Sequence, residues 1–410
     1  MKILHLSTSD IEGGAARATY RLCRGLQSLN ITTKMLVRAK LSADASVIAQ
    51  RNILTKLSPT VSGLPLIVYS QRHHTMFSPQ WFPDTIASQV RQINPHIVHL
   101  HWICNGYMRI ETLAKFNKPL VWTLHDMWAF TGGCHYNQEC QKYQDSCGAC
   151  PQLKSNSNWD LSRWVWYRKY QAWKNLNLTI VTPSAWLAKC ASSSSLLKNL
   201  PIKVIPNGID INKYQPIEKH LARKLLNLPQ DRQLILFVAM STAEKRKGFH
   251  LLQPALKKLS QSNNHHNFEL IILGANKSGE ELDLGFKSNY LGRLNDDITL
   301  ALVYSAADVF VAPSTQDNLP NTVMESLACG TPCVAFKIGG MSEMIEDRKN
   351  GYLAKPYDVE DLAQGIYWVI ENKERQQQLS NYAREKAEQE FSLELQASRY
   401  LSLFQEVIKN

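Results

Sequence analysis

Residues 308–332 of the chain read DVFVAPSTQDNLPNTVMESLACGTP, and this stretch decides the fold. The apolar run from Asp308 to Ala312 predicts a buried strand, and a polar loop follows it. Pro320 suits the first turn of a helix, where its missing N–H is not needed, and Gly330 with Pro332 ends that helix. A buried strand, a loop and a helix in this order indicate an α/β domain.

Two acids lie on either side of the predicted helix start. Asp317 precedes it, and Glu325 lies about one and a half turns inside the helix at 3.6 residues per turn. Helix N-termini attract phosphate. If a phosphate binds at this helix start, one acid can reach a sugar on its far side and the other a ribose on its near side. Ordinary α/β turn chemistry is the plainer explanation, but the paired acids favour a nucleotide-sugar site.

The same segment resembles the acid-x7-acid signature of retaining glycosyltransferases of family four. Asp317 stands where Glu is usual, which shortens the reach by one methylene and keeps the charge. The version Asp317 to Thr322 resembles a subgroup of bacterial exopolysaccharide transferases. The resemblance covers nearly the whole chain. It implies an α/β GT-B fold, with two facing Rossmann-like domains, an interdomain cleft and a C-terminal helix that crosses back to the first domain.

Length and composition agree with two domains of globular protein. The chain has 410 residues, 44% of them hydrophobic, and no apolar run of the length that a membrane span needs. Residues 1–7 enter a strand without a secretory pattern, so we expect a cytoplasmic protein, with peripheral contact at the inner membrane face as an option. A net charge of +11 suits an anionic partner. Nucleic acid is the least favoured partner, because neither a run of five bases nor zinc-finger spacing occurs.

Strand and helix patterns alternate along both halves. In the first half we expect strands at 2–8, 33–39, 96–102, 120–124 and 178–182, and helices at 15–29, 84–93 and 185–196. In the second half we expect strands at 234–240, 269–273, 308–312 and 332–336, and helices at 248–260, 297–305, 320–329 and 358–372. The predicted domains are residues 1–205 (acceptor side), 206–388 (nucleotide-sugar side) and a C-terminal helix, 389–410. The linker near 201–216 contains Pro206-Asn207-Gly208-Ile209-Asp210, which resembles the turn that joins the two lobes in this family.

Basic residues follow the first predicted strand of the second half. Lys247 stands immediately before Gly248, where the family places a lysine on the diphosphate. The family's Gly-Arg is Met240-Ser241 here, so Arg246 or Lys245 would supply the second charge. A solvated basic loop is the alternative explanation.

Other site residues follow from the resemblance. In the second half it implies donor contacts by a set of residues near the two acids and the nucleotide base, namely Asn318, Leu319, Asn321, Thr322 and Arg293. In the first half, Gly14 lies in a loop that closes over the distal phosphate, and His125 lies against the donor sugar. A plain turn and a structural histidine are the alternatives. His99 and His101 are expected to be structural rather than acceptor-side groups.

Four cysteines cluster between the predicted strands at 120–124 and 178–182. They are Cys134, Cys140, Cys147 and Cys150, and the last two form a Cys-x2-Cys knuckle. In a reducing compartment two explanations remain open, a structural zinc site and a free or redox-variable cluster. The gaps before the knuckle are not a standard zinc pattern.

Aromatic and basic residues alternate from Trp159 to Lys174. Trp166, Tyr170 and Trp173 share a helix face, which favours an aromatic stripe that packs inward under a basic face. The alternative is a membrane-surface or lipid-linked acceptor site.

These features together favour a retaining hexosyltransferase, with Asp317, Glu325, Lys247 and His125 as its central residues. By resemblance, UDP-glucose is the favoured donor and a GDP-sugar the second choice. The acceptor is a glycan or lipid-linked saccharide, and no cofactor or catalytic metal is required. Three alternatives stay open: a non-catalytic sugar-nucleotide or glycan-binding scaffold, an epimerase or phosphorylase of the same fold, and DNA glucosylation, for which no duplex-reading element is visible.

Overall fold

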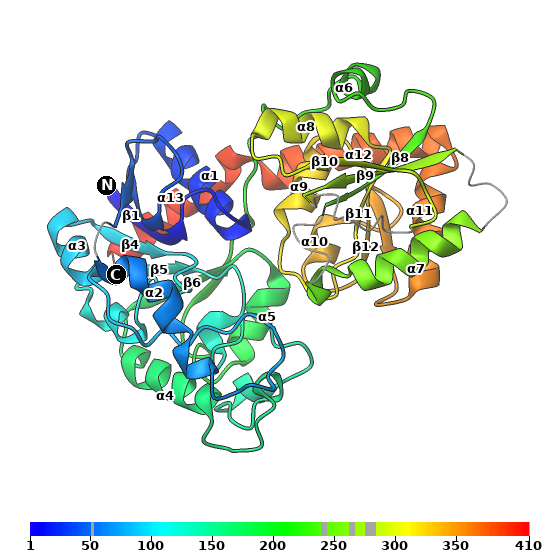
Figure 1. The fold of residues 1–410 in the computed structure, drawn as a ribbon. Helices are drawn as coiled ribbons and strands as arrows, with labels where there is room; N and C mark the ends of the chain where they lie inside the picture. Colours follow the sequence, from blue (N-terminus) through cyan, green and yellow to red (C-terminus); the bar gives the residue numbers. More distant parts are fainter. Residues whose placement is uncertain (51–52, 239–243, 262–266, 275–283, 410) are drawn as a thin grey trace. The chain divides into compact units, whose positions relative to one another are not determined.

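The computed structural model describes residues 1–50, 53–238, 244–261, 267–274 and 284–409. The chain divides into two compact units, coloured by sequence in Figure 1. Unit 1 contains Met1–Pro206 and Gln396–Asn410, and unit 2 contains Asn207–Leu395. The chain returns to unit 1 at Gln396, seven residues later than the predicted boundary at residue 389. Phe391 belongs to the core of unit 2, and the backbone of Ile209 bonds to Phe391 and Leu393, so these residues stay with unit 2.

Unit 1 is built on a seven-stranded parallel sheet in the order β3-β2-β1-β4-β5-β6-β7. Its strands are β1 (Lys2–Ser9), β2 (Thr32–Ala39), β3 (Val47–Ala49), β4 (Ile97–Leu100), β5 (Leu120–Thr123), β6 (Leu178–Thr182) and β7 (Ile202–Val204). Its helices between Met1 and Pro206 are α1 (Gly14–Ser28), α2 (Ile53–Ser62), α3 (Ile86–Ile93), α4 (Leu161–Trp173) and α5 (Ala185–Ser193). The strand order reverses between β1 and β4, so the carboxyl ends of these two strands border the topological switch point of the sheet.

A helix from the far end of the sequence completes the core of unit 1. This helix, α13 (Leu393–Lys409), packs Tyr400 and Phe404 among Ile3, Ile97 and Val121 of the sheet. The Tyr400 hydroxyl lies 2.7 Å from Thr123 Oγ1. In Figure 1, α13 (red) lies beside β1 (dark blue), although the two elements are the last and first in the chain. The apolar face of α13 is therefore part of the unit 1 core.

Unit 2 is a six-stranded parallel sheet in the order β10-β9-β8-β11-β12-β13. Its strands are β8 (Gln233–Val238), β9 (Phe268–Leu273), β10 (Ser288–Gly292), β11 (Val309–Ala312), β12 (Cys333–Phe336) and β13 (Gly351–Ala354). Its helices are α6 (Lys219–Leu225), α7 (Phe249–Ser260), α8 (Asp297–Ala306), α9 (Asn321–Ala328), α10 (Met341–Met344), α11 (Val359–Ile370) and α12 (Lys373–Phe391). The order reverses between β8 and β11, which places the switch point of this sheet there.

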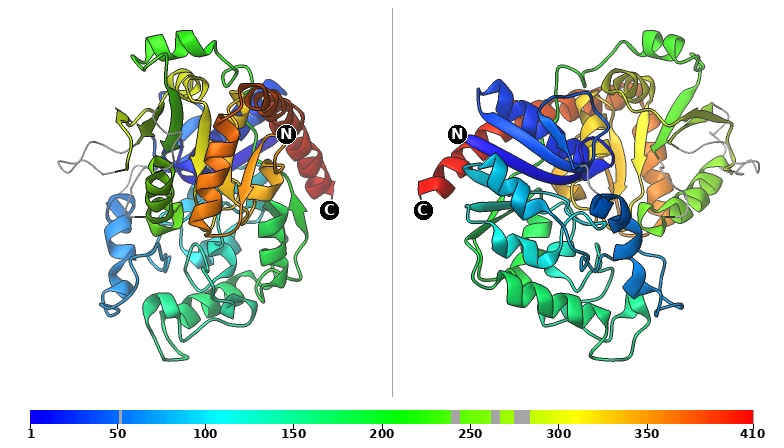
Figure 2. Two further views of the ribbon diagram at one scale, coloured as in Figure 1. Left: turned by 90° about the vertical axis from the view of Figure 1, so that its right-hand side faces the viewer. Right: turned by 60° about the vertical axis from the view of Figure 1, so that its left-hand side comes forward.

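Apolar side chains leave both faces of the unit 2 sheet. Alternate residues of β8 and β11 belong to two separate cores, one shared with α7 and α11 and the other with α8, α9 and α12. Figure 2 shows helices on either side of this sheet. Burial on both faces explains why the strand Val309–Ala312 is continuously apolar rather than alternating. The predicted α/β class, with two parallel-sheet Rossmann-like units, is confirmed.

Candidate active site

The site is best defined in unit 2, on the loops that leave β8 and β11 at the switch point. Lys247 follows β8, and its Nζ lies 2.7 Å from Asp317 Oδ2 in the loop after β11. Arg246 Nη1 lies 3.3 Å from the same carboxylate oxygen and donates to the Gln316 carbonyl at 3.0 Å. The structure therefore brings together Lys247, Arg246 and Asp317, three residues that the sequence singled out in separate segments.

A close backbone contact fixes these two loops against each other. Gly248 has a φ of 74°, and a Cβ at this position would lie 1.7 Å from the Pro313 carbonyl oxygen. Only glycine allows that approach. The Thr315 N–H also donates to the Arg246 carbonyl at 2.8 Å. The two cations are thus held over the β11 loop by backbone interactions as well as by charge.

Asp317 is a buried carboxylate, 6% exposed, and its environment keeps it ionised. Burial by itself would raise the pKa of Asp317. The charges of Lys247 and Arg246, with hydrogen bonds from Lys247 Nζ and the Asn318 N–H, outweigh burial and lower this pKa to about 2. The site therefore contains two cations beside an ionised Asp317, and Arg246 Nη2 also pairs with Glu244 Oε1 at 2.6 Å.

Glu325 lies inside α9 and is buried. It accepts a hydrogen bond from the Tyr304 hydroxyl of α8 at 3.1 Å. Asn318 and Leu319 are buried in the loop before the helix, and Asn321 and Thr322 are the first residues of α9. Pro320 is the N-cap residue of α9 rather than its first helical residue, because its ψ of 125° is extended. The N–H groups at the start of a helix carry partial positive charge, which favours an anion there.

A glycine pair after β12 completes the surroundings of Asp317, and the sequence analysis missed it. A Cβ on Gly339 would lie 2.0 Å from the Asp317 carbonyl oxygen, and the Gly340 N–H donates to that oxygen at 3.2 Å. The sequence feature that could have indicated this loop is the Gly-Gly pair three residues after the strand predicted at 332–336. Three loops, after β8, β11 and β12, therefore meet at Asp317.

Two other predicted donor-site segments are placed less directly. Arg293 is exposed and follows β10, the edge strand, which is separated from β11 by β9 and β8. Met240 and Ser241, which replace the family's Gly-Arg, lie outside the described residues.

In unit 1 the predicted residues lie on the loops after β1 and β5. Gly14 opens α1, and Gly13, its N-cap residue, has φ 88° and ψ 163°, a conformation essentially restricted to glycine. A Cβ on Gly13 would find no atom within 4 Å, so the space above this loop is open within unit 1.

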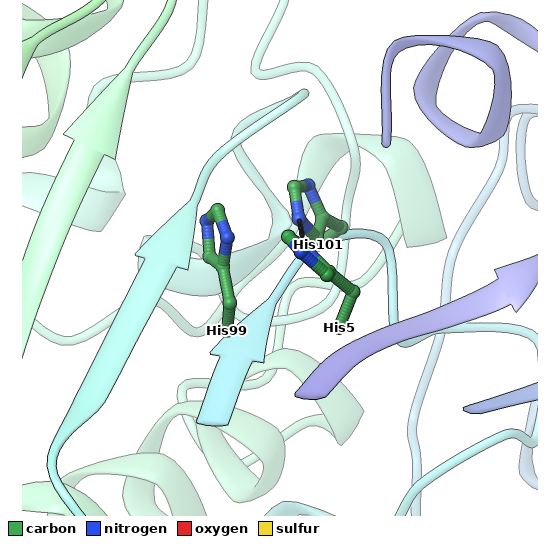
Figure 3. A group of neighbouring side chains, drawn as sticks. All are labelled: His5, His99 and His101. Carbon is green, nitrogen blue, oxygen red and sulfur yellow. Dashed lines mark hydrogen bonds between the residues drawn. The ribbon is translucent and has the colours of Figure 1, made fainter. Parts of the chain in front are cut away.

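His125, at the end of β5, belongs to a chain of buried histidines. His125 Nε2 lies 3.1 Å from His101 Nδ1, and His101 Nε2 lies 3.2 Å from His5 Nδ1. Figure 3 shows His5 on β1 beside His99 and His101, which extend from β4 and the residue that follows it; candidate ligand nitrogens of these three lie within 4.8 Å of one another. His99 Nε2 lies 2.7 Å from Thr123 Oγ1. His101 thus connects His125 to the rest of the chain of histidines.

The histidines are neutral in the folded protein. Burial lowers the pKa of His5 to about 3 and that of His125 to about 4, with the Asp126 charge opposing the shift of His125. The pKa values of His99 and His101 are also lowered, again chiefly by burial and then by neighbouring histidines. His5 Nε2 and His99 Nδ1 are buried without a hydrogen-bond partner. The histidines of unit 1 are thus neutral donors and acceptors, in contrast to the paired charges of Lys247, Arg246 and Asp317 in unit 2.

Asp126 anchors the loop that carries His125. It accepts hydrogen bonds from Trp102 Nε1 at 2.8 Å and from the Trp128 N–H at 2.8 Å, and it lies 2.6 Å from His135 Nδ1. Burial would raise the pKa of Asp126, but the charge and hydrogen bonds of His135 with the other donors lower it. Asp126 therefore holds His125 in position as a structural anion.

The aromatic-basic helix α4 is oriented differently from our prediction. Leu161, Val165, Lys169 and Trp173 form its buried face, whereas Trp166 and Tyr170 stack on each other outside this face, and Tyr170 is exposed. The prediction that Trp166, Tyr170 and Trp173 all pack inward is therefore wrong for Trp166 and Tyr170. Lys169 instead finds carbonyl partners in the interior, at Trp128 and Thr131. Among the described residues, no helix is both long and apolar enough to cross a membrane.

Two family models match this chain. Residues 12–213 match "Glycosyltransferase Family 4", and residues 218–386 match "Glycosyl transferases group 1". The two matches cover nearly all of both units, and the chain is a glycosyltransferase of the family-four type with the GT-B fold.

Three similar proteins illustrate this relationship. An uncharacterized glycosyltransferase of Methanocaldococcus jannaschii is 26% identical over 327 residues, 74% of this chain and 80% of that protein. The fold is similar to sucrose-phosphate synthase from Thermosynechococcus elongatus, with TM-score 0.70, 18% identity, and coverage of 100% and 99% of the two chains. It is also similar to Anabaena HepE in complex with UDP-glucose, with TM-score 0.64, 18% identity, and coverage of 99% and 100%.

Proposed function

We propose that this glycosyltransferase moves a hexose from a nucleotide diphosphate sugar to a hydroxyl of a glycan or lipid-linked saccharide in polysaccharide synthesis, with retention of the anomeric configuration. The observation that carries the proposal is the cluster of Lys247, Arg246 and Asp317 at the switch point of unit 2. Ligands of parallel α/β sheets bind at this edge, and two cations fixed there suit a pyrophosphate.

Each residue of unit 2 has a role that its position supports. Lys247 and Arg246, with the first turn of α9, would neutralise the departing diphosphate. Asp317 would hold hydroxyls of the donor sugar and keep the two cations in place. Glu325, held by the Tyr304 hydroxyl, would bind the ribose. These fixed charges would do the work that a metal does elsewhere, so the proposed transfer needs no catalytic metal.

The proposed bond changes are confined to the donor and the acceptor. The bond from the sugar's anomeric carbon to the phosphate oxygen breaks, and a bond to the acceptor oxygen forms on the same face. The acceptor hydroxyl gives its proton to the departing phosphate oxygen. His125, neutral and connected to His101, would hold a hydroxyl of the donor sugar rather than take this proton.

UDP-glucose is the donor we favour, and a GDP-sugar is the second choice. The fold similarity to HepE in complex with UDP-glucose supports this preference. A thermal-shift panel of UDP-, GDP- and ADP-sugars tests it, because a ligand at a hundred times its dissociation constant stabilises a protein by about 2.7 kcal/mol. A shift with GDP-sugars and none with UDP-sugars would reverse the preference.

We also propose that the acceptor is lipid-linked and that α4 contacts the membrane that carries it. Trp164, Tyr167 and Tyr170 are exposed on α4, and Arg168 lies over the Trp164 ring at 4.4 Å. Arg168 itself is paired with Glu111 at 2.7 Å, but Lys174 is exposed at the end of α4. Exposed aromatic rings near an exposed basic group suit a membrane interface. Co-sedimentation with anionic vesicles should be reduced by Trp164→Ala and Tyr167→Ala together. Equal sedimentation of the parent and the double variant would contradict this role.

The main test of the function compares three variants at the unit 2 site. Lys247→Ala and Glu325→Ala should abolish transfer while circular dichroism shows both variants to be folded. Lys245→Ala is the matched control, because Lys245 is exposed in the same turn. Near-normal turnover of Lys247→Ala or Glu325→Ala would show that the active site lies elsewhere.

A non-catalytic scaffold is the second candidate, supported by Asp317 where the family usually has Glu. It predicts a thermal shift with a nucleotide sugar but neither transfer nor slow hydrolysis. An epimerase would instead convert the nucleotide sugar without any acceptor, and a phosphorylase would consume glycan with phosphate. Product analysis with and without an acceptor extract distinguishes these activities.

A further inference from the structure

The segment between the loop of His125 and α4 is held together by few regular elements. Residues 131–160 contain two 3-10 turns, η4 (Lys142–Gln144) and η5 (Pro151–Leu153), and a single bridge from Cys134 to Phe77. This segment contains Cys134, Cys140, Cys147 and Cys150. Loop-rich segments of this kind commonly depend on a cross-link or a bound metal for a fixed structure.

The four thiols surround one small cavity. Cys134, Cys140, Cys147 and Cys150 all line a space of about 20 Å³. Every pair of these thiols lies close enough for their charges to interact. A space of this size has room for a water-sized particle such as a metal ion.

Backbone N–H groups point at two of the sulfur atoms. Burial raises the pKa of Cys147 and Cys150, and the Gly132 N–H beside Cys147 and the Gln152 and Leu153 N–H groups beside Cys150 oppose that shift. Such donors stabilise a thiolate, which is the form that binds a metal. Cys147 and Gly148 both have positive φ, 53° and 97°, so the knuckle makes a tight left-handed turn.

The backbone around the cysteines is anchored to neighbouring elements. The Cys150 N–H donates to Asp160 Oδ2 at 2.7 Å, and the Gly148 N–H donates to Ser162 Oγ at 2.9 Å, both at the start of α4. Asn137 Nδ2 donates to the Cys140 carbonyl at 2.8 Å. The thiols are therefore presented by a fixed backbone.

A buried cation lies beside the thiols. Lys169 is fully buried, donates to the Trp128 and Thr131 carbonyls, and lies 3.6 Å from the centre of the Trp128 ring. Its charge interacts favourably with Cys134 and Cys147. A lysine is rarely buried this completely unless negative charge or hydrogen bonding compensates it. Asp126 provides part of that negative charge, and thiolates in the cavity would add to it.

We propose that Cys134, Cys140, Cys147 and Cys150 bind one structural Zn²⁺ ion as a closed tetrathiolate site. Binding releases four thiol protons, and four thiolates with one Zn²⁺ carry a net charge of −2, which the Lys169 ammonium partly offsets. Among the described residues, the histidine group of Figure 3 brings three ligand atoms within 4.8 Å, whereas the thiols are more widely spaced. Zinc would draw each sulfur to about 2.3 Å from the ion.

The exposure of the thiols argues against the redox alternative. Cys150 is buried, and Cys134, Cys140 and Cys147 are only partly accessible. Redox-sensing cysteines have to meet an oxidant and a resolving thiol at the surface, so a four-thiol cavity behind a fixed backbone suits a structural metal better.

The test is elemental analysis of the full chain, expressed with zinc and purified in reducing buffer. We expect about one equivalent of zinc, as a single closed site requires. Cobalt reconstitution should give the thiolate-to-metal charge-transfer absorption of a tetrahedral site. Cys140→Ser should lose most of the bound metal, whereas the matched control Cys190→Ser, on α5 outside the cluster, should keep it.

Three results would overturn the proposal: less than half an equivalent of zinc after reconstitution, iron in place of zinc, or disulfides joining these cysteines under reducing purification. If Cys140→Ser does not fold, the parent protein still gives a test. A chelator should lower its melting temperature and added Zn²⁺ should restore it, and an unchanged melting temperature would exclude a structural metal.

Discussion

Gly13 and Gly248 occupy equivalent places in the two units. Each follows the first strand of its sheet and is the N-cap residue of the next helix, with φ of 88° and 74° respectively. They differ in what lies above them. A Cβ on Gly248 would lie 1.7 Å from the Pro313 carbonyl oxygen, whereas a Cβ on Gly13 would meet nothing within 4 Å. One glycine allows two loops to pack, and the other leaves open space beside a helix start.

This difference separates two uses of the same local structure. In unit 2 the close contact holds Lys247 and Arg246 over Asp317, so the charged site is assembled within the unit. In unit 1 the loop after β1 adopts a glycine conformation with open space beside it, and the buried groups at this edge of the sheet include neutral histidines next to the ionised Asp126. We infer that unit 2 assembles its charges by packing several loops together, whereas unit 1 leaves its first loop open.

The largest expected effect is that of Gly248→Ala. The new Cβ would force the backbone at Pro313 to move, and the left-handed φ adds strain, so we expect a loss of at least about 4 kcal/mol in the free energy of unfolding. Denaturant unfolding followed by circular dichroism measures it. A loss below about 1 kcal/mol, the size of an ordinary substitution, would mean that the two loops are not held together by this contact.

Lys247→Ala comes next and affects chemistry rather than folding. Removal of a group that stabilises developing charge typically lowers kcat by about 10²–10³, equivalent to about 2.7–4 kcal/mol. We expect a loss of this size in a variant that circular dichroism shows to be folded, measured as initial rates with the donor that the thermal-shift panel identifies. A loss that appears in KM alone would indicate that Lys247 binds the donor without assisting its departure.

Gly13→Ala should have a smaller effect on stability. The backbone conformation at Gly13 is essentially restricted to glycine and costs about 1–3 kcal/mol for another residue, but no neighbouring atom is displaced. The free energy of unfolding should therefore fall by that amount, less than for Gly248→Ala. Equal losses for the two variants would remove the contrast between the two loops.

Measured per histidine and per pH unit, the smallest expected effect on stability is the response of unit 1 to acid. An unfolded histidine takes up its proton near pH 6.5, whereas burial holds the pKa of His5 at about 3 and that of His125 at about 4. Below pH 6.5 the unfolded chain binds more protons, so this stability is complete above pH 6.5 and is lost as the pH falls toward 4. The loss is about 1.4 kcal/mol per pH unit for each histidine.

The two units should differ in this response. The lowered pKa of Asp317 contributes stability that is complete above its unfolded pKa of 3.8 and is lost only as the pH falls toward 2. All tryptophans except Trp368 lie in unit 1, so tryptophan fluorescence in urea at pH 7.5 and pH 5 reports mainly on that unit. An unfolding midpoint that does not change between these pH values would contradict the neutral burial of the histidines.

The strands and the unit 2 site could be predicted because their signals are local. The run from Asp308 to Ala312, the Pro-Asn start of α9 and the base before Gly248 each act within a few residues. Lys169 could not be predicted, because its burial depends on carbonyls of Trp128 and Thr131, which lie about forty residues earlier in the sequence. A helical stripe indicates which residues share a face, but distant partners decide which face is buried.

The placement of α13 has a consequence for biosynthesis. Ile3, Ile97 and Val121 need Tyr400 and Phe404 as packing partners, and the ribosome adds those residues only after all of unit 2. A nascent chain that has emerged as far as Pro206 therefore exposes an uncovered apolar surface while the rest is translated. Such an intermediate is a natural client for chaperones, and a fragment that stops before Gln396 should aggregate rather than fold.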